Sequence, residues 1–181
     1  MIRLLRHGVG QRLRIWSDGD WPTDHVPTRG VAIEWVGQVG HPTSYVLLGG
    51  SPSDKSGVTV GDYGPVFEDA LAGAADVVRL GLLDEYRGAV DEVLANPTDD
   101  ARPMTISLAA HGEAGSSIVA FRAGTIFLTT IFERVASLDD AELWARWRAA
   151  LRQAGAFSTR KAEDAAADVR PESEVTHGDR G

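Results

Sequence analysis

Two apolar segments, VAIEWVG at residues 31–37 and SYVLLG at residues 44–49, decide the fold class of this sequence. Both are short, rich in β-branched and aromatic side chains, and bounded by glycine, proline and threonine. Runs of this kind between turn residues are typical of β-strands. Together with QRLRIWS at 11–17, they predict an antiparallel sheet.

A further strand is predicted downstream. Residues 104–110, MTISLAA, alternate in the manner of a half-buried strand, and they follow a loop at 96–100 that is rich in Asn, Pro and Asp. The segment 82–95, LLDEYRGAVDEVLA, fits either a helix or a turn that leads into a strand from Ala89, and we favour the helix.

Helices are predicted on either side of these elements. Pro65 suits a first helical turn, and a central helix over 64–80 would place Phe67, Leu71, Ala74 and Val78 on one face, with Gly81 closing it. A C-terminal helix over 138–154 follows an N-cap sequence with acidic residues in its first turn. Its apolar stripe is Leu143, Trp144, Trp147 and Leu151.

The segment 117–133, SIVAFRAGTIFLTTIFE, fits two structures because it is apolar on every side. Two β-branched clusters around Ala123-Gly124 predict a hairpin, which would complete a three-stranded meander with 104–110. The alternative is one continuous helix across Gly124. We favour the hairpin.

The sequence therefore predicts one α+β domain over residues 1–155, an antiparallel sheet packed by a central and a C-terminal helix. Its 181 residues, 43% of them hydrophobic, are enough for one buried core. Residues 156–181 are polar with few apolar side chains, and we expect a mobile tail.

Composition limits the function. There is no cysteine, which excludes disulfides and thiolate chemistry, and the net charge of −8 disfavours general binding to phosphate backbones. Arg3 and Arg6 interrupt the apolar start that a signal peptide needs, and no run is long enough to cross a membrane, so we expect a cytoplasmic location.

Motifs of common enzyme classes are missing. The sequence holds no G-x-S-x-G, Walker, G-x-G-x-x-G, H-E-x-x-H or calcium-loop motif. None of the five histidines lies three or four residues from another, the spacing of a helical metal pair. We expect no catalytic residue, no metal and no cofactor.

One short enzyme motif is present. Leu4-Leu5-Arg6-His7-Gly8 resembles the Arg-His-Gly of histidine phosphatases, and Ala110-His111-Gly112-Glu113 is similar to the second histidine of that family. The resemblance implies phosphoester hydrolysis with His7 as the nucleophile. Val9 after the motif and the antiparallel strand pattern depart from the family, so this stays the third function.

A longer resemblance covers about residues 31–136. The segment YGPVFE at 63–68, then Gly81-Leu82-Leu83 and Tyr86, resembles domain four of elongation factor G and of the ribosome-protection proteins. Downstream, His111 and the segment SSIVAFR at 116–122 are similar to that family's tip-loop histidine and to the start of its next helix. The resemblance implies a helix from Ser117, with His111 on a protruding loop, and a role in contacting the ribosome.

We predict a noncatalytic macromolecule-binding protein. A protein partner, immunity- or chaperone-like, is favoured, and the acidic charge would steer a basic partner towards the chain. A ribosomal or RNA site is the second choice. The candidate binding residues are His111, Glu113, Ser116, Ser117, Trp144 and Trp147.

Overall fold

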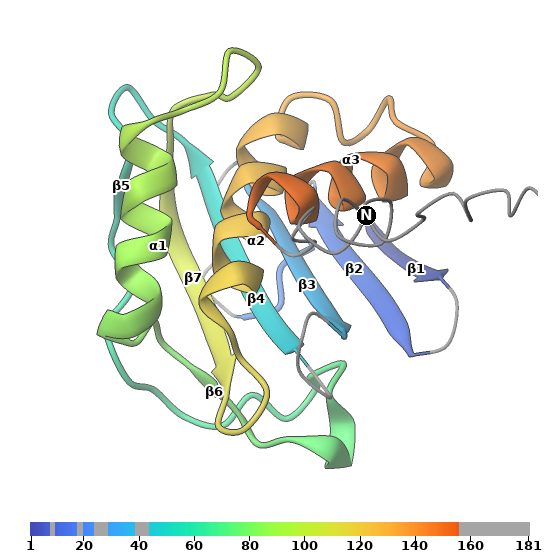
Figure 1. Cartoon of the computed structure of the whole chain (residues 1–181), viewed down its shortest axis with the longest axis vertical. Helices are drawn as coiled ribbons and strands as arrows, with labels where there is room; N and C mark the ends of the chain where they lie inside the picture. The colour runs from blue at the N-terminus through green and yellow to red at the C-terminus, as the bar shows by residue number, and fades with distance from the viewer. Residues whose placement is uncertain (8–9, 18–19, 24–28, 39–43, 156–181) are drawn as a thin grey trace, which may run out of the picture.

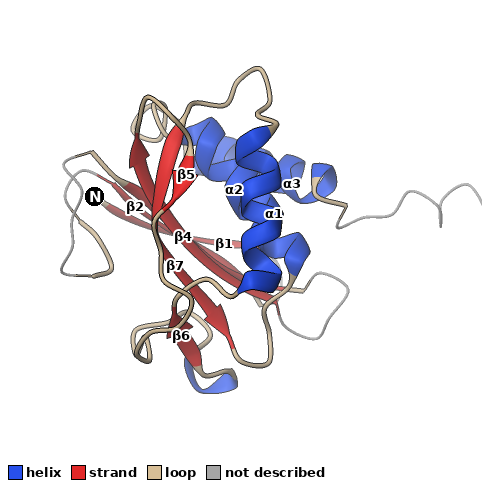
Figure 2. Ribbon diagram, turned by 90° about the vertical axis from the view of Figure 1, so that its left-hand side faces the viewer, coloured by secondary structure: helices blue, strands red, loops and turns tan. Residues whose placement is uncertain are grey.

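A computed structural model describes residues 1–7, 10–17, 20–23, 29–38 and 44–155. Three helices cover one face of a seven-stranded mixed sheet (Figures 1 and 2). In chain order, the elements are β1 Ile2–His7, β2 Gln11–Ser17, β3 Val31–Gly37, β4 Ser44–Pro52, β5 Gly57–Val58, a 3₁₀ turn Gly73–Ala75, β6 Val78–Leu80, α1 Asp84–Ala95, β7 Met104–Gly112, α2 Ile118–Ile131 and α3 Asp140–Gln153. The described residues thus form a single α+β domain, as predicted.

The sheet has the order β1-β2-β3-β4-β7-β5, and β6 pairs with the C-terminal end of β7. All pairs are antiparallel except β5 with β7, which is parallel. The strands predicted at 11–17, 31–37, 44–49 and 104–110 are confirmed as β2, β3, β4 and β7.

Each face of the sheet buries its own apolar cluster. The larger cluster lies under the helices and includes Ile33, Trp35, Leu48, Phe127 and Trp147. The smaller one lies on the opposite face and includes the following side chains from the strands and from the segment before β6: Trp16, Val36, Tyr45, Leu47, Phe67, Leu71 and Val78. Alternation along the strands assigns each residue to one of the two clusters.

The predicted hairpin at 117–133 is wrong. The segment forms the helix α2, which is capped by the Ser117 side chain accepting a hydrogen bond from the Ala120 backbone (3.2 Å). Gly124 is not a turn residue: a Cβ there would lie 3.1 Å from Leu48 Cδ1, so the glycine lets the helix lie close to β4. A helix buried on all sides is apolar all round, and this explains the ambiguous pattern.

The predicted central helix over 64–80 is also wrong. Phe67 N–H donates to the Val78 carbonyl (2.8 Å), and Val66 bridges Arg79, so the chain here folds back on itself as an irregular loop. Phe67 and Leu71 are buried as a helical stripe would be, but against the second face of the sheet. Gly73 has φ of +55°, a value that suits glycine and interrupts a helix.

The other two predicted helices are confirmed. The segment 82–95 forms α1, and 138–154 forms α3, whose N-cap Asp139 makes a capping box with Glu142. No helix within the described ranges is long and apolar enough to cross a membrane. The predicted tail at 156–181 lies outside the described residues.

Candidate functional site

The end of β7 and the loop that joins it to α2 carry four of the six predicted site residues. His111 is the penultimate residue of β7 and is only 2% exposed, and its Nδ1 lies 3.2 Å from the Gly81 carbonyl oxygen. Its ring also faces Tyr86, at 6.2 Å between ring centroids. The expectation of a histidine on a protruding loop is therefore wrong: His111 helps to hold α1 against β7.

Asp76 holds the β7–α2 loop in place through hydrogen bonds. Its two carboxylate oxygens accept hydrogen bonds from the backbone N–H groups of Ala114 (3.0 Å) and Gly115 (2.8 Å). A Cβ on Gly112 would lie 1.9 Å from Asp76 Oδ2, so only glycine leaves room for the carboxylate. Backbone N–H groups bound by a carboxylate give charge-assisted hydrogen bonds, which fix the loop in one conformation.

The two serines complete the framework. Ser116 Oγ donates to the Tyr45 carbonyl (3.0 Å) and accepts from Gly112 N–H (2.8 Å), while Tyr45 N–H donates to the Gly115 carbonyl (2.8 Å). The loop is thereby attached to the start of β4, and Ser117 caps α2. Both serines have a structural role, which their position before a helix could have indicated.

Glu113 is the predicted residue that faces solvent, and it belongs to an exposed surface. Its Oε1 lies 2.5 Å from Arg79 Nε, and the Arg79 guanidinium lies over the Tyr63 ring, 5.3 Å from its centroid. Val66 and Val77 flank Arg79, because Val66 is its bridge partner and Val77 is two residues away on the same side. We call Tyr63, Val66, Val77, Arg79 and Glu113 the β6 surface.

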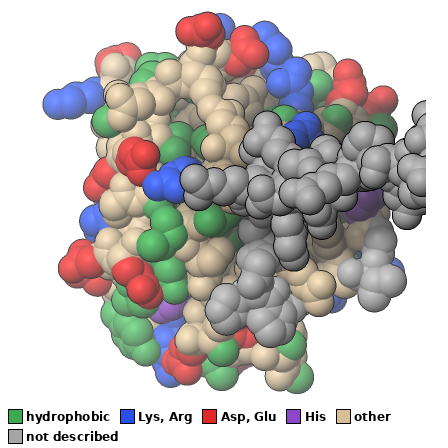
Figure 3. Space-filling view, in the orientation of Figure 1, with side chains coloured by type: hydrophobic (Ala, Val, Ile, Leu, Met, Phe, Trp, Pro, Cys, Tyr) green, Lys and Arg blue, Asp and Glu red, His purple; other side chains and the backbone are tan. Residues whose placement is uncertain are grey.

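The β6 surface combines apolar and acidic character. Tyr63 is 64% exposed, and Val66 and Val77 are each about half exposed. The segments that build this end, 62–79 and 112–117, contain five Asp or Glu, of which Asp62, Asp69 and Glu113 are paired with Arg87, Arg14 and Arg79. Figure 3 shows hydrophobic and acidic side chains side by side at the lower end of the molecule.

Behind the loop, a buried polar cluster anchors Tyr45. The Tyr45 hydroxyl donates to Glu34 Oε1 (2.8 Å), Leu71 N–H donates to the same oxygen (2.6 Å), and Arg14 Nε and Nη2 donate to Oε2 (2.9 and 2.6 Å). Burial raises the pKa of Glu34, although Leu71 and Arg14 counteract it, and burial beside Glu34 raises the pKa of Tyr45 well above its usual value. A single charged residue within VAIEWVG was the signal that could have predicted this cluster.

The remaining predicted site residues, Trp144 and Trp147, lie in the core. Trp147 is fully buried between Trp35, at 5.1 Å between ring centroids, and Phe127, at 5.4 Å. Trp144 is 7% exposed and contacts the His7 ring. Neither side chain offers a surface to a partner.

The structure does not bring the phosphatase-like residues together. Arg6 and His7 are adjacent in β1 and therefore point to opposite faces of the sheet. His111 lies on β7, four strands away, which corresponds to about 19 Å. In the described part of the chain, no group of three or more His, Asp or Glu side chains could hold a metal ion.

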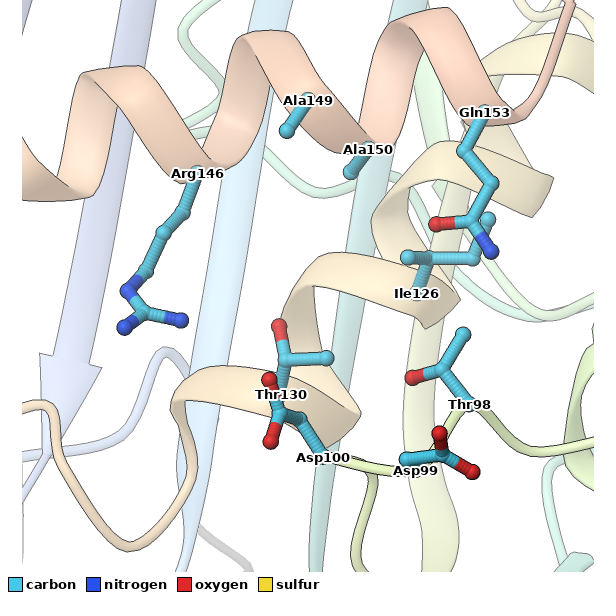
Figure 4. Close-up of a pocket in the computed structure, with 9 residues that line it drawn as sticks. All are labelled: Thr98, Asp99, Asp100, Ile126, Thr130, Arg146, Ala149, Ala150 and Gln153. Carbon is cyan, nitrogen blue, oxygen red and sulfur yellow. The ribbon is translucent and has the colours of Figure 1, made fainter.

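A shallow groove of about 330 Å³ runs between α3 and the loop that precedes β7 (Figure 4). Asp99 and Asp100 lie on the loop side of the groove, and Arg146 and Gln153 lie on the α3 side. Thr130 of α2 lies at its base. The groove shares no residue with the β6 surface and contains no histidine or cysteine.

Comparison with protein-family models, with curated protein sequences and with solved structures returns no match.

Proposed function

We propose that this chain is a noncatalytic binding domain that engages a protein partner through the β6 surface. The single observation that supports it is an exposed Tyr63 and two exposed valines around one salt bridge, on a fixed framework. Exposed apolar side chains with a polar rim are characteristic of protein interfaces, and tyrosine is enriched in them.

The framework matters because ordering a loop on binding costs conformational entropy. Asp76, Gly112 and Ser116 already hold the loop in place in the free chain. Preorganisation of this kind leaves more of the contact energy for affinity. The net charge of −8 favours a partner with a basic contact surface.

A ribosome-binding role is the second candidate, and one observation favours it. The continuous helix α2 across Gly124 follows the order of elements that the resemblance to elongation factor domain four implies. The bridge between Tyr45 and Ser116 also joins the start of β4 to the β7–α2 loop. The net charge of −8 ranks the RNA partner second.

The two candidates can be separated by site-specific photocrosslinking. A photoreactive phenylalanine analogue at Tyr63 should crosslink, in the native cell, to one protein other than a ribosomal component. The same analogue at Arg148, an exposed position on α3 that does not line the groove, is the matched control. Crosslinks from Tyr63 to ribosomal RNA or ribosomal proteins would support the second candidate, and crosslinks equal to the control would contradict both.

A surface variant completes the test. Val77→Arg adds a positive charge, which a basic partner repels, at a half-exposed position and should abolish the crosslink without changing the melting temperature. Asp76→Ala should weaken it about tenfold by freeing two backbone N–H groups, although it alters no residue of the β6 surface. An unchanged crosslink in Val77→Arg would exclude the β6 surface as the contact.

A further inference from the structure

The opposite edge of the sheet presents a second set of unpaired groups. Within the described ranges, β1 pairs only with β2, so its outer side carries no neighbouring strand (Figure 1). Met1 and Ser17 exchange both backbone hydrogen bonds, and the register then alternates along the ladder. The N–H and C=O groups of Ile2, Leu4 and Arg6 consequently point outwards.

The side chains of these three residues share one face of the sheet. Leu5 lies in the helix-covered cluster, and Arg3 donates to the Leu138 carbonyl (2.7 Å) at the start of α3. Alternation therefore directs Ile2, Leu4 and Arg6 to the opposite face, where Ile2 is 57% and Leu4 46% exposed. A flat edge with two exposed apolar side chains is a template for strand addition.

Charge identifies what the edge would bind. Arg6 and Arg12 are directly opposite each other on β1 and β2 and point to the same face. Arg12 donates to the Leu71 carbonyl oxygen (2.6 Å), and among the described residues neither guanidinium is paired with a carboxylate. Like charges that lie directly opposite each other in a sheet destabilise it. The chain has a net charge of −8, yet none of its carboxylates in the described residues neutralises this pair.

We propose that the outer edge of β1 binds an extended segment of a partner protein by strand addition, with acidic side chains facing Arg6 and Arg12 and apolar ones covering Ile2 and Leu4. Main-chain hydrogen bonds to β1 would supply affinity, and alternate side chains would supply specificity. This surface lies at the far edge of the sheet from the β6 surface, and the proposal does not depend on the function proposed for that surface.

The test uses the full chain and a capped synthetic peptide, Thr-Glu-Thr-Val-Thr-Ile-Thr, whose Glu, Val and Ile share one face of an extended strand and would lie opposite Arg6, Leu4 and Ile2 in an antiparallel pairing. Binding should slow hydrogen exchange at the amides of Ile2, Leu4 and Arg6 by about tenfold or more, as NMR can measure residue by residue. A peptide with Lys in place of Glu is the charge control and should give no protection. Equal protection by both peptides would overturn the proposed acidic specificity.

Two variants locate the contacts. Arg6→Glu should weaken peptide binding about tenfold, whereas Arg148→Glu, an exposed arginine on α3, should leave it unchanged. Leu4→Pro removes one outward N–H, which an edge strand tolerates, and should abolish binding while the fold is retained. Peptide binding that survives Leu4→Pro would refute strand addition.

The remaining outcomes assign the edge to another occupant and would overturn the proposal. Protection of the three amides without peptide would show that the edge is already covered, by a second copy if it depends on concentration and by the same chain if it does not. An oligouridylate that competes through Arg6 and Arg12 without protecting the amides would indicate an RNA phosphate site.

Discussion

Arg14→Met should destabilise the fold strongly, because it leaves the Glu34 carboxylate buried without its cation. Glu34 is fully buried, and Arg14 supplies both hydrogen bonds to its Oε2. Methionine keeps much of the apolar stem that packs near Trp16. Removing one partner of a buried ion pair costs about 3–5 kcal/mol, which corresponds to a fall in Tm of roughly 6–20 °C for a domain of this size.

The loss should depend on pH with a defined sign. Burial raises the pKa of Glu34 above the ordinary 4.5, and Arg14 limits that rise. Without Arg14 the folded-state pKa rises further, so the folded chain retains a proton that the unfolded chain has lost. The free energy of unfolding of the variant should therefore fall as pH increases from about 4.5 through the raised pKa, more steeply than in the wild type.

Urea denaturation of four chains between pH 5 and 8 tests this: the wild type, Arg14→Met, Glu34→Gln and the double variant. The double variant should recover most of the lost stability, since a neutral amide needs no counterion. Arg102→Met, which removes an exposed pair with Glu133, is the control and should cost at most about 1 kcal/mol. A similarly small, pH-independent cost for Arg14→Met would refute the importance of the buried pair.

Three further predictions concern stability. Trp147→Ala should lower the free energy of unfolding by about 3–5 kcal/mol in chemical denaturation. Trp147→Phe should lower it much less, because the indole N–H that this variant removes is buried without a hydrogen-bond partner. Equal losses in the two variants would contradict this. Gly112→Ala should lower the free energy of unfolding by about 1–3 kcal/mol and Asp76→Ala in the same chain should relieve part of it; additive losses would exclude the clash. Truncation after Gly155 should change the Tm by less than about 5 °C in calorimetry, and a larger fall would show that residues 156–181 contribute to the fold.

The strands were predictable because their environment leaves a direct mark on the sequence. In β2 and β3 the two faces of the sheet alternate, and short β-branched runs between turn residues follow from that. The helix α3 was equally predictable from the sequence, since one face meets the sheet and the other meets solvent, and Asp139 marks its start. In each of these elements, local preference and tertiary position agree.

The two wrong predictions, at 117–133 and at 64–80, arose where local preference and tertiary position disagree. In α2, packing against the sheet on one side and against α1 and α3 on others removes any polar face, and Gly124 serves close packing rather than a turn. In 64–80, helical spacing of Phe67 and Leu71 was coincidental, because the loop buries them against the second face of the sheet. Both outcomes are set by contacts distant in sequence, which a local pattern does not encode.

The net charge of the sequence likewise does not predict how charge is distributed around the candidate site. A net charge of −8 predicted one kind of partner, a basic one, yet charge is not evenly distributed over the sheet. On the β6 surface Glu113 is paired with Arg79, while the β1 edge has Arg6 opposite Arg12 without a paired carboxylate in the described residues. The strand order separates these edges by β2, β3, β4 and β7, or about 24 Å, well beyond the Debye length at physiological ionic strength. Each surface therefore acts on a partner through its own local charge, and a β1 edge that attracts acidic segments is compatible with a small domain of acidic net charge.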